Sequence, residues 1–191
     1  MPSRSLQTWR TVRCQALDEI EYAHRGVAHS RRGSRFATQQ VNYAYVMLLS
    51  SQFQAFCREL HSECADFFVQ SITPLARSKA CRFLLARHLA LDRGNPNPGN
   101  IGADFNLFDL AFWNDLRSFD IRNADRRDRL EELNLWRNAI AHQDFDPARF
   151  SGTMLPIRRV REWRNACDQL ATAFDEVMRR HFSSLCGASP W

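Results

Sequence analysis

Residues 130–142 read Leu-Glu-Glu-Leu-Asn-Leu-Trp-Arg-Asn-Ala-Ile-Ala-His. On an α-helix, which turns by about 100° per residue, one side of this stretch is apolar, and we expect it to face a core. That side carries Leu130, Leu133, Trp136 and Ile140. The adjoining arc is polar, and it carries Asn134, Arg137, Asn138 and His142 around the small Ala141. The sequence therefore predicts a helix whose buried face is bordered by an arc that can hold a ligand.

Arg137, Asn138 and His142 have the order Arg-Asn-x-x-x-His, which resembles the signature of the HEPN superfamily and of its RiboL-PSP-like nuclease groups. A similar spacing recurs at Arg82 and His88, so the spacing alone decides little. The later pair differs in the Asn that follows the Arg, in the small residues beside it, and in the amphipathic helix expected after a short loop. These features favour the resemblance at residues 137–142.

The resemblance implies a helical domain that cleaves RNA without a metal or another cofactor, in the role of a toxin or defence effector. It further implies a homodimer in which two signature helices face one cleft, so that two copies of Arg137 and His142 form a composite active site. Histidine suits proton transfer near neutral pH, and arginine suits the charge that develops on phosphate. The expected products are a 2′,3′-cyclic phosphate and a 5′-hydroxyl.

Further residues are expected to bind or orient the RNA substrate. Asn138 lies four residues before His142 and can orient its imidazole or contact phosphate. The other candidates are Asn134, Arg126, Arg127 and Arg129. An alternative for the basic residues is a solvated helix end. An alternative for the whole site is that Arg137 pairs with Glu132 or Asp144 and that His142 merely closes the helix.

Two function classes stay open at this point. In the first, the chain is a nuclease, whose partner is RNA and, in a toxin system, an antitoxin or a nucleotidyltransferase. In the second, the same cleft belongs to a non-catalytic helical dimer that binds nucleotide, RNA or a partner protein. The excess of basic residues, a net charge of +5, suits an anionic partner such as RNA but does not separate these classes.

Length and composition indicate one globular domain over residues 1–191. Hydrophobic residues make up 45% and charged residues 25%, which argues against disorder. Apolar runs such as residues 43–49 are far shorter than the roughly 20 residues that cross a bilayer, so we expect no membrane partner. The N-terminal residues have no continuous apolar segment, and we expect a cytoplasmic location.

Cys57, His61 and Cys64 share one helical face and are the only residues whose spacing suggests a metal site. The same face carries Phe53, Leu60 and Phe68, and a fourth ligand is missing from it. Core packing is the favoured interpretation, and we expect no metal.

The apolar periodicity predicts an all-α fold, an up-and-down bundle of about five helices that dimerises. The expected helices are residues 5–28, 35–71, 74–92, 104–119, 124–143 and 157–184, with loops at 94–102 and 144–156 and a loose tail at 186–191. The last helix has the most regular stripe, and it can pack within the bundle or across a dimer. His181 lies on that stripe and is expected to be packed rather than catalytic.

The segment 94–102 reads Gly-Asn-Pro-Asn-Pro-Gly-Asn-Ile-Gly. Its prolines and glycines predict a loop. One interpretation is a plain linker between helices. The other is a loop beside the active cleft, because similar Gly-Asn-Pro loops precede the catalytic helix in some HEPN-like groups.

Overall fold

The structure, a computed structural model, describes residues 1–28, 34–72, 81–82, 84–150 and 152–191. Over these residues it is all helical and contains no strand, so the predicted all-α class is confirmed, whereas the expected arrangement of about five helices is not, because the same residues form eight α-helices. Its α-helices are α1 (Arg4–Thr8), α2 (Cys14–Ala28), α3 (Ser34–Ile72), α5 (Ala90–Arg93), α6 (Pro98–Phe105), α7 (Phe112–Phe119), α8 (Asn123–His142) and α9 (Ile157–Cys186). A π-helical turn, Trp9–Arg13, joins α1 to α2, and a 3-10 turn, Asn106–Phe108, follows α6.

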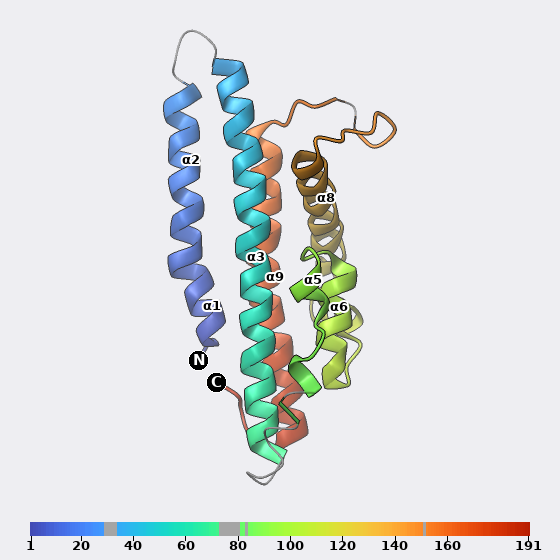
Figure 1. Cartoon of the computed structure of the whole chain (residues 1–191). Helices are drawn as coiled ribbons and strands as arrows, with labels where there is room; N and C mark the ends of the chain where they lie inside the picture. Colours follow the sequence, from blue (N-terminus) through green and yellow to red (C-terminus); the bar gives the residue numbers. More distant parts are fainter. Residues whose placement is uncertain (29–33, 73–80, 83, 151) are drawn as a thin grey trace.

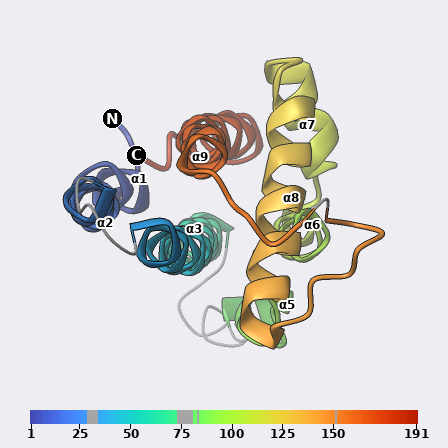
Figure 2. The ribbon, with the colours of Figure 1, turned by 90° about the horizontal axis from the view of Figure 1, so that it is seen from above.

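Four long helices form the body of the molecule, and α3, which packs against the other three, is the central one (Figure 1). Figure 2 looks along α2, α3 and α9 but shows α8 from the side, so α8 crosses the other three. The short helices α5, α6 and α7 lie along α8. The sequence predicted which helices are amphipathic, but it did not predict this crossing. The apolar stripe of a helix shows which side is buried, not the angle at which the helix crosses its neighbour.

Aromatic side chains fill the core where α3, α6, α7 and α9 meet. Phe105 stacks on Phe112 with ring centroids 4.4 Å apart, and Phe112 meets Phe174 edge to face at 4.8 Å. Trp9 packs against Phe53 at 5.6 Å and donates its indole N–H to Asp168 Oδ1 at 3.0 Å. These contacts fix the N-terminal segment and the short helices on the long pair α3 and α9.

The helix expected at residues 74–92 differs from the structure. Residues 73–80, and with them the predicted start of this helix at residue 74, lie outside the described residues. The described part leaves helical geometry at residues 87–89, where His88 has a φ of 61°, and α5 follows as a separate turn. Both carboxylate oxygens of Asp104 accept hydrogen bonds from the first N–H groups of α5, at 2.7 and 2.9 Å.

The loop predicted at residues 94–102 is wrong in its second half, because α6 begins at Pro98. The Asn97 side chain caps this helix by accepting from Asn100 N at 2.8 Å, and a proline in the first turn loses no intrahelical hydrogen bond. The continuous helix predicted at 104–119 is also wrong, since the chain turns at Asp109, with a φ of 61°, before α7 begins. Proline was read as a helix breaker where it starts a helix.

The tail predicted to be loose is anchored. Trp191 packs against the core, and its indole N–H donates to Asp175 Oδ2 at 3.2 Å. The other oxygen of Asp175 accepts from the backbone N–H of Ser3 at 3.0 Å, so one carboxylate holds both ends of the chain, which lie close together in Figure 1. Among the described residues, no helix is long and apolar enough to cross a membrane.

Candidate functional site

The C-terminal end of α8 presents the polar residues singled out in the sequence. Leu130, Leu133 and Ile140 are buried, as their spacing predicts, and they fix the rotation of α8 on the core. The helix stops after His142 because Gln143 takes a left-handed conformation with a φ of 54°, while Asp144 N donates to Ala139 O at 3.0 Å. His142 is therefore the last helical residue, and it is exposed to solvent.

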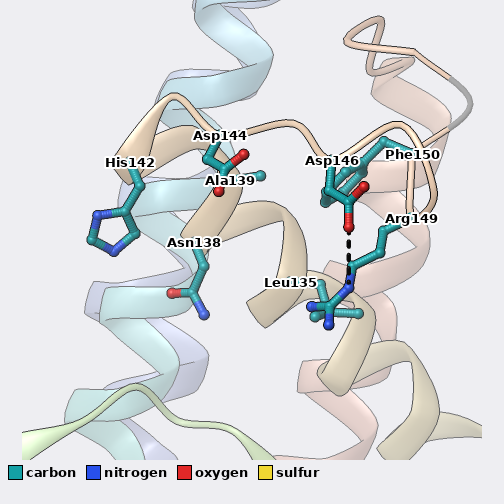
Figure 3. A pocket seen from close by; sticks show the side chains of 8 residues that line it. All are labelled: Leu135, Asn138, Ala139, His142, Asp144, Asp146, Arg149 and Phe150. Carbon is teal, nitrogen blue, oxygen red and sulfur yellow. Dashed lines mark ion pairs between the residues drawn. The ribbon is translucent and has the colours of Figure 1, made fainter.

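A pocket of about 400 Å³ opens beside this end of α8. Its lining comes from α8 and from the segment that follows it: Leu135, Asn138, Ala139, His142, Asp144, Asp146, Arg149 and Phe150 (Figure 3). Asp146 and Arg149 form an ion pair across 3.7 Å on the side opposite His142. The pocket thus combines an exposed imidazole and a carboxamide with two carboxylates and a guanidinium.

Arg137 does not line this pocket with His142, because the two residues lie about 140° apart around the helix. Its guanidinium is half-buried and donates from Nη1 to Asn138 Oδ1 at 3.2 Å. Glu132, one of the carboxylates considered as its partner, is bound instead by Arg159 Nη2 at 2.6 Å and by Trp163 Nε1 at 3.0 Å. Within the described part of the chain, no carboxylate forms an ion pair with Arg137.

The Gly-Asn-Pro loop before α6 lies directly against α8. Asn95 Nδ2 donates to Asn138 Oδ1, which is also the acceptor for Arg137. One turn earlier, Asn134 Nδ2 donates to Pro96 O at 3.1 Å and to Leu130 O at 2.8 Å. Asn134 is 2% exposed, and its side chain holds the loop on α8. The interpretation that this loop lies beside the candidate site agrees with the geometry.

The basic residues expected to bind RNA lie at the other end of α8. With a rise of 1.5 Å per residue, Arg126 is about 24 Å along the helix from His142. Its guanidinium is paired with Asp120 at 2.9 Å, and Arg129 is paired with Glu162 at 3.2 Å. Arg127 is exposed and lies 5.3 Å from the ring centre of Trp113. The single chain does not bring these three arginines to the pocket.

Cys57, His61 and Cys64 are all fully buried. The imidazole of His61 lies between Phe105 and Phe108, with ring centroids 5.6 and 4.8 Å away, and burial lowers its pKa to about 4. Burial likewise raises the pKa of both thiols well above the usual value. Over the described ranges, no group of His, Cys, Asp and Glu side chains is arranged to hold a metal ion. These residues belong to the core.

Asn95 is the site residue that sequence reasoning did not single out. The sequence does show an Asn in the loop that one interpretation places beside the cleft. Its contact with Asn138 was not predicted, because the two residues are 43 positions apart in the sequence. Asp146 was likewise missed, and Asp144 was considered only as a partner of Arg137, since both belong to a segment without regular spacing.

Comparison with protein-family models, with curated proteins and with solved structures finds no match. Function is therefore inferred from the side chains of the site.

Proposed function

We propose that this protein is a metal-independent endoribonuclease of the HEPN type, acting at the end of α8 that carries Arg137, Asn138 and His142. The observation that carries the proposal is the state of Arg137. Its guanidinium is held by a neutral carboxamide rather than by a carboxylate, and an exposed histidine, His142, follows it along the same helix. An arginine whose charge is not neutralised by the protein is available to a phosphate.

In the proposed reaction, the neutral imidazole of one His142 takes the proton from the 2′-hydroxyl of RNA. The 2′-oxygen then forms a bond to phosphorus while the bond from phosphorus to the 5′-oxygen breaks, and the leaving oxygen receives a proton from an imidazolium. Arg137 stabilises the negative charge that develops on the phosphate oxygens. The products are a 2′,3′-cyclic phosphate and a 5′-hydroxyl, so that atoms and charge balance without a further reactant.

A homodimer completes this site. One His142 cannot both remove and supply a proton in the same event, and Arg137 does not line the pocket that His142 lines. A second copy that places its own α8 against this end provides a second histidine and a second arginine. We therefore propose a composite site between two protomers of a single-domain, cytoplasmic protein, with the biological role of a toxin or defence effector. An antitoxin or a nucleotidyltransferase is the protein partner to test.

The alternative is a non-catalytic dimer that binds RNA, nucleotide or protein through the same cleft. Multiple turnover of RNA distinguishes the nuclease from this alternative. The experiment compares cleavage of a labelled structured RNA with cleavage of DNA of the same sequence, which lacks the 2′-hydroxyl. The nuclease proposal predicts multiple turnover on RNA, none on DNA, and loss of cleavage in His142→Ala. Under the alternative, Arg137→Ala weakens binding and turnover is absent throughout.

A further inference from the structure

A second cationic group lies on the surface just before the Gly-Asn-Pro loop. Arg87 Nε donates to His88 Nε2 at 2.7 Å, and Arg93 Nη2 contacts the other ring nitrogen of His88. All three side chains are exposed. The left-handed conformation of His88, with a φ of 61°, turns the chain between the preceding helical residues and α5 and so brings Arg87 and Arg93 to one imidazole.

This arrangement contains more donors than acceptors. A neutral imidazole has one N–H and one lone pair, and a guanidinium has no acceptor at all. The ring of His88 can therefore accept a hydrogen bond from only one of the two arginines, and the other contact sets a donor against a donor. An anion that accepts from Arg93 and from the ring N–H satisfies both groups.

The nearest carboxylates along the chain are engaged elsewhere. Asp92 pairs with Arg58 at 2.8 Å. The oxygens of Asp104 accept from the N–H groups of Ala90 and Leu91 at the start of α5. Neither is bound to Arg93, and among the described residues no carboxylate forms an ion pair with Arg93.

The cluster is also close to the candidate site. Arg93 is two residues from Asn95, so their Cα atoms are at most about 7 Å apart, and the Asn95 side chain contacts Asn138. Asn95 and Pro96 contact the C-terminal half of α8, whereas α7 meets its N-terminal end, where Asn123 Nδ2 donates to Leu116 O. Two arginines that can bind phosphate, Arg137 and Arg93, therefore lie on either side of residues 94–97.

We propose that Arg93, together with the ring N–H of His88, binds a backbone phosphate of the RNA strand that flanks the cleaved phosphodiester. Guanidinium groups hold phosphate oxygens in pairs, and no base is needed for such a contact, so the subsite anchors RNA without selecting its sequence. This inference rests on the proposed function for the identity of the ligand. The sequence predicted that Arg126 and Arg129 contact RNA, but both are paired with carboxylates. In this proposal Arg93 takes their place as the main electrostatic contact to RNA.

The test uses a short fluorescent 2′-O-methyl RNA, which cannot be cleaved by 2′-hydroxyl attack. Its affinity is measured by anisotropy over a range of salt concentrations for wild type, Arg93→Gln, Arg93→Lys and the control Arg117→Gln. Arg117 is an exposed arginine on α7, at the far end of α8. Each phosphate contact to a single strand contributes about 0.7 to the slope of log affinity against log salt.

We expect Arg93→Gln to bind about five- to tenfold more weakly near 0.1 M salt and to lose about 0.7 of the slope, as one phosphate contact requires. Arg93→Lys keeps the slope, and Arg117→Gln matches wild type. Equal effects of Arg93→Gln and Arg117→Gln, or no binding by wild type, would overturn the subsite.

A parallel assay with unmodified RNA separates this inference from the proposed function. If the 2′-O-methyl RNA binds through Arg93 and the unmodified RNA is never cleaved, the phosphate subsite stands and the nuclease proposal fails. If the unmodified RNA is cleaved and Arg93→Gln changes neither affinity nor slope, the nuclease proposal stands and the subsite fails.

Discussion

The side chain of Asn95, in the loop after α5, donates to the same oxygen of Asn138 that accepts from Arg137. Two donors from different parts of the chain thus fix the carboxamide of Asn138, and through it the guanidinium of Arg137. Asn95 is a positioning residue in this account, since it reaches the proposed chemistry only through Asn138.

Replacing Asn95 by Ala removes one of these two donors and leaves the carboxamide of Asn138 held by Arg137 alone. The loss of one such hydrogen bond, about 1 kcal/mol, predicts a roughly fivefold lower kcat with little change in KM. Steady-state cleavage of RNA measures this, and Asn165→Ala, an exposed Asn on α9, is the matched control. An unchanged kcat in Asn95→Ala would remove Asn95 from the site.

Asn134 is predicted to matter for stability rather than for RNA contact. Its buried amide group holds Pro96 O and Leu130 O, and its removal leaves the Pro96 carbonyl without this donor. We expect Asn134→Ala to lower the free energy of unfolding by about 1–3 kcal/mol in urea denaturation. The affinity for 2′-O-methyl RNA should stay within twofold of wild type at temperatures where the variant is folded. A folded variant of normal stability that binds RNA poorly would contradict this role.

His61 predicts a dependence of stability on pH. Its imidazole is buried between two phenylalanine rings, and burial lowers its pKa to about 4, against roughly 6.5 in an unfolded chain. The unfolded state therefore binds the proton more readily. Stability is fully present above about pH 6.5 and falls as the pH drops towards 4, by about 3 kcal/mol in total.

The measurement is urea denaturation at several values between pH 7 and pH 4 for wild type and His61→Leu. The leucine variant has no imidazole to protonate, and the difference in free energy between the two proteins isolates the histidine from other titrating groups. We expect wild type to lose stability relative to His61→Leu as the pH falls. Parallel curves would show that His61 is not buried as a neutral group.

Trp191 is predicted to stabilise the whole fold although it is the last residue. Its ring packs on the core and its N–H binds Asp175, which also holds Ser3. Trp191→Ala should lower the free energy of unfolding by about 1–3 kcal/mol, whereas Trp191→Phe, which keeps an aromatic ring, should cost about 1 kcal/mol or less. Thermal melting compares them. A Trp191→Ala variant that melts with wild type would restore the prediction of a loose tail.

The long helices were predictable because each carries an apolar stripe that recurs every three to four residues. Leu130, Leu133 and Ile140 are buried as their spacing requires, and the stripe of α9 is buried along its length. The short helices were not predictable in this way. Pro98 begins α6 because Asn97 caps it, and Trp191 is fixed by a carboxylate 16 positions away, so neither outcome depends on periodicity.

The candidate site was predictable in part. The order of Arg137, Asn138 and His142 places three polar groups on one end of a helix, and the structure retains that placement. Residues that join the site from elsewhere leave no pattern along the chain. Asn95 meets Asn138, and Arg93 meets His88, only because the chain turns at His88 and again before α6.

The most direct test of the central claim is the chemistry of the RNA ends left by the purified protein in EDTA. The account predicts that wild type turns over repeatedly and leaves a 2′,3′-cyclic phosphate and a 5′-hydroxyl. His142→Ala and Arg137→Ala should retain the wild-type fold and lose cleavage by about a hundredfold or more, as the loss of a proton-transfer group or of a charge stabiliser requires. Cleavage that leaves a 5′-phosphate, that persists in His142→Ala, or that is absent from the folded wild-type protein would contradict it.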